Sequence, residues 1–215
     1  MDECEIVVFD LDGTLVRGDS FSRFLTELFL RRPLHSLLAS IPALPLSLFP
    51  RWRRPAANLW LRAATTGLTE ARYQQLVESY VRRRYSPTSG RPIHAALTRL
   101  HAHQTAGHTV IVVTGSEERL AREICRSLGL EGIEVVGTTL VPHRGAMELG
   151  IHCYGPAKLQ RLREKGFSGP ISCVYTDSSV DLPLLTAATQ RFLVEPATTH
   201  RKRIHATLGH CAILE

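Results

Sequence analysis

The sequence has few of the features that mark exported or disulfide-bonded proteins. Five cysteines are scattered over 215 residues, and none forms a CxxC pair or a Cys-His metal spacing. The residues after Met1 are acidic, whereas an export signal begins with basic residues. No internal repeat or low-complexity tract is present. We therefore expect a folded cytosolic chain with reduced thiols and no export signal.

The chain also lacks the composition of a disordered or multi-span membrane protein. Hydrophobic residues make up 44% and charged residues 21%, and the length suits one α/β domain with a small inserted module. The formal charge of +6 favours an anionic partner such as nucleic acid, an anionic membrane or a phosphorylated substrate. Nucleic acid is disfavoured because the run Arg82 to Arg84 has no aromatic stacking platform.

Short apolar runs alternate with helical patterns along most of the chain. Each of three β-branched runs ends in polar residues, as buried parallel strands do: 5–9, 109–113 and 171–175. The helical patterns cover 92–105, 117–128 and 157–165. This alternation predicts an α/β fold with a doubly wound parallel sheet, whose ligands bind beyond the carboxyl ends of the strands.

Two segments interrupt the alternation. Residues 17–87 have helical patterns only, and we expect an all-α cap inserted into a core of residues 1–16 and 88–215. Residues 136–153 contain three glycines between short β-like runs, which favours a hairpin that extends the sheet edge.

Two aspartates follow the first expected strand, in the segment FDLDGTLV. Asp10 and Asp12 can face one site only if the backbone leaves strand geometry between them, and Gly13 permits that bend. Paired carboxylates at such a place suit magnesium binding, nucleophilic attack and proton transfer. The plainer alternative is a turn or a helix N-cap.

With these residues the chain resembles the haloacid-dehalogenase-like (HAD) superfamily, and more narrowly its subfamily IB. The four motifs of the superfamily occur in order at Asp10 to Thr14, at Thr114, at Lys158, and at Asp177 to Asp181. An acid at position 12 fits phosphatases and phosphomutases, since the dehalogenase branch has no acid there and the ATPase branch has lysine. The fourth motif departs from the common Gly-Asp-Gly form.

The resemblance implies a magnesium-dependent phosphomonoester hydrolase with an aspartyl-phosphate intermediate on Asp10. It makes Asp12 the acid and base, and Thr114, Gly115 and Lys158 the phosphate-binding residues. Magnesium would be held by Asp10, Asp12 and Asp177, with Asp181 orienting these ligands. A hard cation is needed because a carboxylate attacks a phosphate dianion poorly unless negative charge is screened.

Residues 34–50 form an uncharged, apolar stretch with three prolines and arginines on both sides. A helix of this length rises roughly 25 Å, short of the roughly 30 Å hydrocarbon core of a bilayer, so spanning is disfavoured. Shallow insertion at an anionic membrane surface and burial as a pair of cap helices both remain open.

Most of the chain also resembles the phosphatidylglycerophosphatase C family, through the segment that begins FDLDGTLV, the proline-containing apolar stretch and the later TGLTEARYQQL. That resemblance implies phosphatidylglycerophosphate as substrate, phospholipid biosynthesis as the context, and a place on the cytoplasmic side of the bacterial inner membrane. Arg17 and Asp19 become candidate substrate contacts. The alternatives are a cytoplasmic small-molecule phosphatase similar to phosphoserine phosphatase, which usually has glutamate where Asp19 stands, and a non-enzymatic membrane-associated module. No obligate protein partner is expected.

Overall fold

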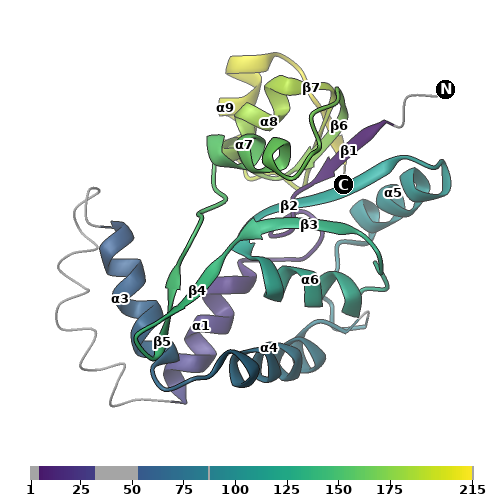
Figure 1. Ribbon diagram of the computed structural model, residues 1–215. Helices are drawn as coiled ribbons and strands as arrows, with labels where there is room; N and C mark the ends of the chain where they lie inside the picture. Colours follow the sequence, from purple (N-terminus) through teal and green to yellow (C-terminus); the bar gives the residue numbers. More distant parts are fainter. Residues whose placement is uncertain (1–4, 32–52, 87, 215) are drawn as a thin grey trace.

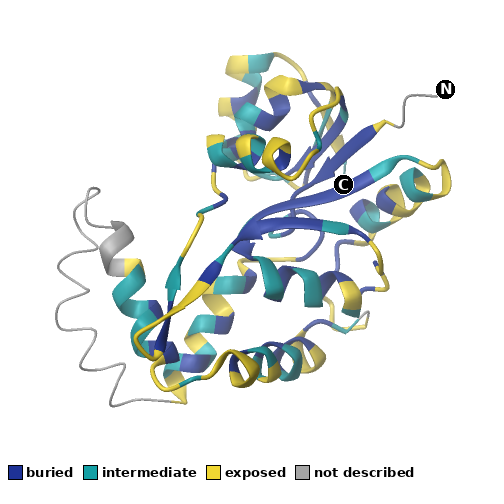
Figure 2. Cartoon of the chain, viewed as in Figure 1, coloured by how far each residue is buried: buried dark blue, intermediate teal, exposed yellow. Residues whose placement is uncertain are grey.

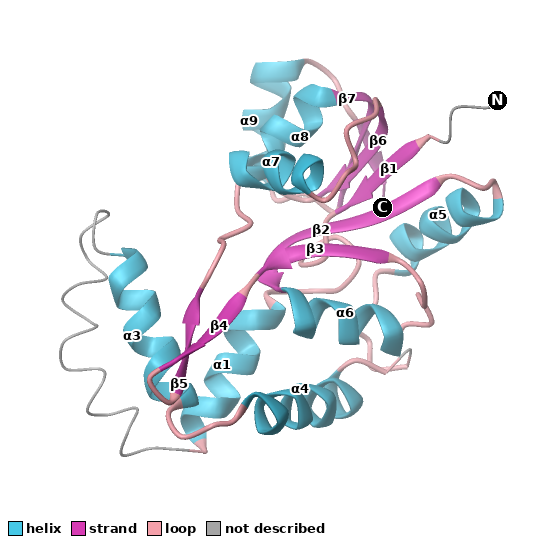
Figure 3. Cartoon of the chain, in the orientation of Figure 1, coloured by secondary structure: helices cyan, strands magenta, loops and turns pink. Residues whose placement is uncertain are grey.

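A computed structural model describes residues 5–31, 53–86 and 88–214, and its centre is a six-stranded parallel sheet (Figures 1 and 3). The strand order is β3-β2-β1-β6-β7-β8, so the chain winds outward in both directions from β1. The strands are β1 Ile6–Phe9, β2 Thr109–Glu117, β3 Glu134–Thr138, β6 Ile171–Thr176, β7 Ala188–Val194 and β8 Ala212–Leu214.

Helices cover both faces of this sheet and extend beyond one end of it (Figure 1). The described helices are α1 Ser20–Leu30, α3 Arg53–Thr65, α4 Glu70–Arg84, α5 His94–Thr105, α6 Glu118–Ser127, α7 Pro156–Glu164, α8 Leu182–Ala187 and α9 Thr198–Leu208. The last three lie on one face, and α5 and α6 lie on the other. This is the doubly wound α/β fold that the sequence predicts.

Alternating side chains of β1 serve two hydrophobic layers, which explains why the strand is apolar throughout (Figure 2). Val7 and Phe9 pack in the layer that includes α5 and α6, whereas Ile6 and Val8 pack in the layer that includes α7, α8 and α9. A central parallel strand buried on both faces needs this continuous apolar run. The polar residues that follow therefore emerge at the end of the sheet.

The predicted strands and helices are confirmed, and their observed ends differ from the predicted ones by no more than two residues. The exception is β2, which continues to Glu117. The expected hairpin also exists, as β4 Leu140–His143 and β5 Ala146–Leu149. Its expected place is wrong, since these two strands form a separate sheet, and β3 is the edge of the main one.

The hairpin leaves the main sheet because its backbone bonds to α3 instead. The amide of Met147 donates to Thr65 Oγ1 at 2.9 Å, and that of Leu149 donates to Asn58 Oδ1 at 2.9 Å. An ion pair joins Arg62 to Glu148. The hairpin thus lies beyond the end of the sheet, together with α1, α3 and α4 (Figure 1).

The apolar stretch 34–50 lies outside the described residues, so its two interpretations stay predictions. In the part of the chain that the structure describes, no helix has the length and apolar character required to cross a membrane.

Candidate active site

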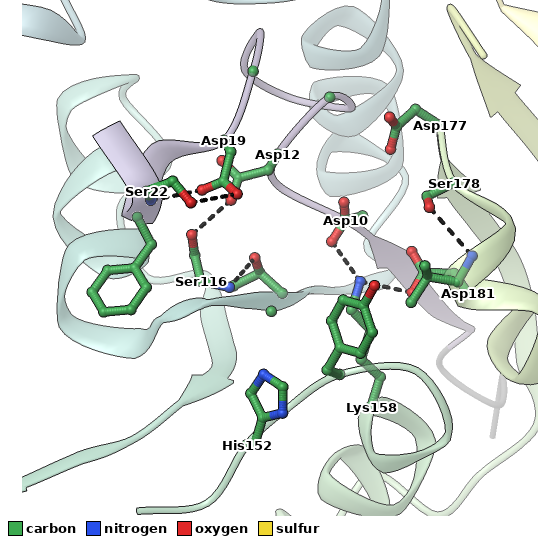
Figure 4. Close-up of a pocket in the computed structure, with 17 residues that line it drawn as sticks. Asp10, Asp12, Asp19, Ser22, Ser116, His152, Lys158, Asp177, Ser178 and Asp181 are labelled. Carbon is green, nitrogen blue, oxygen red and sulfur yellow. Dashed lines mark hydrogen bonds and ion pairs between the residues drawn. The ribbon is translucent and has the colours of Figure 1, made fainter. Parts of the chain in front are cut away.

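A cavity of about 580 Å³ lies at the carboxyl ends of β1, β2 and β6, where the polar sequence motifs meet (Figure 4). The walls combine residues that are far apart in the sequence, among them Asp10, Asp12, Thr114, Gly115, Lys158 and Asp177. In a parallel sheet all carboxyl ends lie at one edge, which is why these motifs converge. The structure thus brings together all the residues expected to perform or support the chemistry.

The loop after β1 is shaped around Gly13. This glycine has φ +80°, and a Cβ added to it would lie 2.3 Å from Asp177 Oδ2. Thr14 Oγ1 accepts a hydrogen bond of 3.1 Å from the amide of Asp177. The first and fourth motifs are therefore in direct contact, and that contact requires glycine.

Lys158 stands between two carboxylates at the base of the cavity (Figure 4). Its Nζ lies 2.7 Å from Asp10 Oδ1 and 2.7 Å from Asp181 Oδ1. Asp181 Oδ2 also accepts a 2.7 Å hydrogen bond from Thr176 Oγ1. Asp181 is thus engaged by Lys158 and Thr176, while Asp10 keeps one oxygen, Oδ2, that makes neither of these contacts.

Burial controls the electrostatics of this pair. Burial alone lowers the pKa of Lys158, but Asp10 and Asp181 more than offset it and the net pKa is raised, so the lysine stays protonated. Burial raises the pKa of Asp10 to about 8; Lys158 opposes this rise, and the charge of Asp181 adds to it. Ionised Asp10 is therefore favoured by any further cation in the cavity.

Asp12 points away from Asp10, toward the start of α1 (Figure 4). Its carboxylate accepts hydrogen bonds from Ser116 Oγ at 2.6 Å, from the Ser20 amide at 2.9 Å and from Ser20 Oγ at 3.1 Å. Burial raises the pKa of Asp12 to about 6, and the hydrogen bonds from Ser116 and Ser20 limit the rise. Such a value suits a group that must both give and take a proton near neutral pH.

The last residues of β2, Thr114 to Ser116, form the opposite wall. Thr114 lines the cavity and is fully buried, and its Oγ1 accepts a 3.0 Å hydrogen bond from the amide of Ser116. Thr138 Oγ1 donates to the carbonyl of Gly115 at 2.7 Å. These bonds fix the end of β2, where Thr114 and Gly115 were expected to bind phosphate.

The two candidate substrate contacts have other partners. Arg17 forms an exposed ion pair with Glu195 and is not part of the cavity wall. Asp19 does line the cavity, but its carboxylate caps α1 by accepting from the Ser22 amide at 2.7 Å and from Ser22 Oγ at 2.9 Å. Asp19 is therefore held in place by the helix that it begins.

Sequence reasoning missed several residues of the wall. Ser20 and Ser116 hold Asp12, and His152 and Tyr154 enter from the segment between β5 and α7 with their rings stacked at 5.4 Å. Ser116 stands two residues after Thr114 of the second motif, and this proximity is the signal that the sequence offers. Nothing in the sequence predicts that the segment after the hairpin returns to the cavity.

The carboxylate oxygens that face the cavity are suitable ligands for a hard divalent cation. Asp10 and Asp177 supply carboxylates, and carboxylate oxygens suit Mg²⁺, which keeps several waters of its own. Within the described ranges no cluster of three His, Cys, Asp or Glu side chains could hold a metal by itself. A metal here would thus need water, a backbone carbonyl or a substrate oxygen to complete its coordination.

The aspartate pair after β1 and the buried Lys158 share one cavity at the carboxyl ends of a doubly wound α/β sheet, where folds of this class bind their ligands. The chain belongs to the haloacid dehalogenase-like hydrolase family, whose model matches residues 7–186.

Relatives and solved structures show how far this similarity extends. A probable phosphatase of Mycobacterium tuberculosis is 33% identical over 107 residues, which are 47% of this chain and 37% of that protein. The chain therefore matches little more than a third of that relative's length. Protein CicA of Caulobacter vibrioides is 28% identical over 193 residues, covering 86% of this chain and 84% of CicA.

Solved structures share the fold, and two of them illustrate this. A protein of unknown function from Bordetella pertussis superposes with a TM-score of 0.74 at 20% identity, over 98% of both chains. A substrate-bound phosphoserine phosphatase superposes with a TM-score of 0.58 at 14% identity, over 100% of this chain and 94% of the other.

Proposed function

We propose that the chain is a magnesium-dependent phosphomonoester hydrolase that forms an aspartyl-phosphate on Asp10. The observation that carries the proposal is the single cavity in which Asp10, Asp12, Thr114, Lys158 and Asp177 meet. Membership of the hydrolase family and the similarity to a probable phosphatase support it. We also assign the chain to subfamily IB, because helices α1, α3 and α4 follow the first motif directly.

In the first step, Asp10 attacks phosphorus and the bond to the leaving oxygen breaks, with the electron pair going to that oxygen. Asp12, protonated beforehand, gives its proton to the leaving oxygen. In the second step, water attacks the aspartyl-phosphate while Asp12 takes its proton. Inorganic phosphate leaves and the carboxylate of Asp10 is restored.

The remaining residues of the site would bind the charged phosphoryl group and the metal ion. Lys158 and the Thr114 hydroxyl would hold phosphoryl oxygens, because both residues line the same cavity as Asp10. Asp10, Asp177 and the carbonyl of Asp12 would hold Mg²⁺, and Asp181 would fix their arrangement through Lys158. When bound, the cation screens the repulsion between a carboxylate nucleophile and a phosphate dianion.

Replacing the nucleophile tests this assignment. Asp10→Asn should abolish Mg²⁺-dependent phosphate release, since an amide oxygen is not a competent nucleophile here, and it should leave the fold intact by circular dichroism. Glu164→Gln, on the solvent side of α7, is the matched control and should retain full activity. Turnover by Asp10→Asn at the parent rate would refute the nucleophile assignment.

For the substrate, we propose a small soluble phosphomonoester of the phosphoserine type, acted on in the cytoplasm. Solved phosphoserine phosphatases share the fold over nearly the whole chain, which supports the proposal at the level of architecture. The polar cavity wall made by Asp19, Ser22 and Ser116 is compatible with a small polar leaving group.

A second candidate substrate is phosphatidylglycerophosphate at the cytoplasmic membrane surface, and one observation favours it. An apolar groove of about 290 Å³ adjoins the catalytic cavity and shares Phe21 and Ser22 with it. The groove follows one face of α1 through Leu25 and Phe29, opposite Trp60 on α3. Its described walls have no charged side chain, which suits an acyl chain rather than an amino acid.

Paired substrates and paired variants separate the two candidates. Activity on phosphoserine should be compared with activity on phosphatidylglycerophosphate in mixed micelles, in parent and in Leu25→Gln. A lipid substrate predicts that Leu25→Gln lowers kcat/KM for the lipid alone. Leu30, 77% exposed on the same helix, gives the control Leu30→Gln. A preference for phosphoserine that Leu25→Gln leaves unchanged would exclude the lipid.

Flotation with anionic vesicles tests directly whether the protein binds a membrane surface. A parent protein that stays with the aqueous fraction at low salt would contradict a membrane-surface substrate, because the flanking arginines should each add about 1 kcal/mol of attraction to anionic lipid.

A further inference from the structure

The turn that carries Asp177 and Asp181 contains hydrogen bonds between residues close in the sequence. The Ser178 amide donates to Thr176 Oγ1 at 3.1 Å, and the Val180 amide donates to Ser178 Oγ at 3.2 Å. The residues from Ser179 to Asp181 form one 3₁₀ turn. The first amide of such a turn has no partner inside it and needs an acceptor from elsewhere.

His200 provides that acceptor from α9, 21 residues further along the chain. The Ser179 amide donates to His200 Nδ1 at 3.2 Å, and Ser179 Oγ lies 2.9 Å from the same nitrogen. An amide can only donate, so Nδ1 must accept and the ring proton is on Nε2. Ser179 itself is buried, with 7% of its surface exposed.

The attachment of α9 to the sheet does not depend on His200. Ile204 of the same helix is fully buried in the hydrophobic layer with Leu162 and Leu184, while His200 is only half-buried. The His200 ring is therefore directed at the turn without being part of the core. Its removal should leave the helix in place and release only the amide and hydroxyl of Ser179.

We propose that His200 is a positioning residue that fixes the Ser179 turn and thereby sets the affinity of the site for Mg²⁺. The inference rests on the proposed function, because it needs Asp177 as a metal ligand. Asp177 and Asp181 lie on either side of Ser179, so a loosened turn displaces both carboxylates together. Loss of a hydrogen bond that orients metal ligands typically weakens metal binding by about 10-fold to 100-fold.

Three substitutions at one position separate a positioning role from a structural one. His200→Asn keeps an acceptor close to the place of Nδ1, His200→Gln moves the acceptor one bond further out, and His200→Ala removes it. We expect His200→Ala and His200→Gln to bind Mg²⁺ about 10-fold or more weakly, and His200→Asn to stay within about threefold of the parent. Lys202→Ala, exposed on α9, is the control and should match the parent.

The primary measurement is calorimetric titration of the metal-free protein with MgCl₂, independent of turnover. Thermal unfolding without metal should be nearly the same for all variants. Steady-state assays should show a raised apparent constant for Mg²⁺, with kcat recovered at saturating metal.

Each failure has a different meaning. Parent-like Mg²⁺ affinity in His200→Ala, or equal losses in the Asn and Ala variants, would overturn the positioning role alone. A parent protein that neither binds Mg²⁺ nor releases phosphate would overturn the proposed function and this inference with it.

Discussion

Lys158→Met removes the one cation that the described structure places between Asp10 and Asp181. Methionine is close in length and unbranched, so the change deletes charge with little change in volume. In the parent, Lys158 Nζ lies 2.7 Å from an oxygen of each carboxylate, and the lysine side chain is only 5% exposed. The variant therefore has two buried carboxylates without their shared partner.

The expected loss of stability follows from that geometry. Removing one partner of a buried ion pair costs about 3 to 5 kcal/mol, because the remaining charge is left uncompensated. Taking about 3 kcal/mol, and about 2 to 4 °C per kcal/mol for a chain of this size, the melting temperature should fall by about 6 to 12 °C without metal. Mg²⁺ should restore part of the loss, since a cation that binds only the folded state stabilises it.

The pH dependence has a definite sign. The pKa of Lys158 is raised on folding, so its contribution in the parent is complete below about pH 10 and is lost only at higher pH. In the parent, burial raises the pKa of Asp10 to about 8 although Lys158 opposes this rise. The variant lacks the lysine, so the pKa of Asp10 should be raised further. A carboxyl with a raised pKa favours the folded state when protonated, so the variant should lose stability as pH rises from about 4 to 8.

Differential scanning calorimetry of parent and variant at pH 5 and pH 8, with and without MgCl₂, measures each of these effects. Lys165→Met is the matched control, because Lys165 ends the same helix, is exposed, and lies 3.8 Å from Glu118. That change should shift the melting temperature by about 2 °C or less. A Lys158→Met protein as stable as the parent at pH 8 without metal would refute the ion-pair reasoning.

Three further outcomes follow from single contacts. Gly13→Ala should lower Mg²⁺ affinity and turnover at least about 10-fold, because its Cβ would meet Asp177 Oδ2; Gly67→Ala, also at positive φ but with open space around it, should cost only about 1 to 2 kcal/mol of stability and keep activity. In single-turnover assays of the first step, Asp12→Asn should slow release of the alcohol from alkyl phosphates by about 10² to 10⁴, and release of p-nitrophenol from p-nitrophenyl phosphate far less, since that leaving group needs no proton. Equal losses in this first step would refute the acid role. Burial lowers the pKa of His103, so unfolding free energy should decline as pH falls below about 6.5, and His103→Gln should flatten this decline in urea titrations.

The core of the fold could be predicted because local patterns and topology agree there. The apolar run from Ile6 to Phe9 predicts a strand that is buried on both faces, and Asp10 and Asp12 come just after it. Since the carboxyl ends of parallel strands share one edge, the sequence pattern alone predicts Thr114 and Asp177 beside these aspartates. Chemistry and topology indicated the same residues.

Contacts between distant segments could not be predicted, because no local pattern encodes them. Ser20 is an ordinary serine in the sequence, and Ser116 is marked only by its closeness to Thr114. Their shared role depends on the contact between the start of α1 and the end of β2. The hairpin was expected at the edge of the main sheet, because glycine spacing predicts a turn and not the partner of its strands. That partner is α3, through side chains such as Asn58 and Thr65.

One continuous segment links the apolar groove to the phosphate end of the cavity. Leu149 at the end of β5 lines the groove, His152 lines the cavity three residues later, and Lys158 follows on the first turns of α7. Hydrogen bonds from β5 tie the start of this segment to α3, and the pair with Asp10 fixes its far end. A leaving group held against Leu149 therefore rests on the same segment that positions Lys158. Substitutions in α3 that shift the hairpin should consequently alter turnover as well as substrate preference.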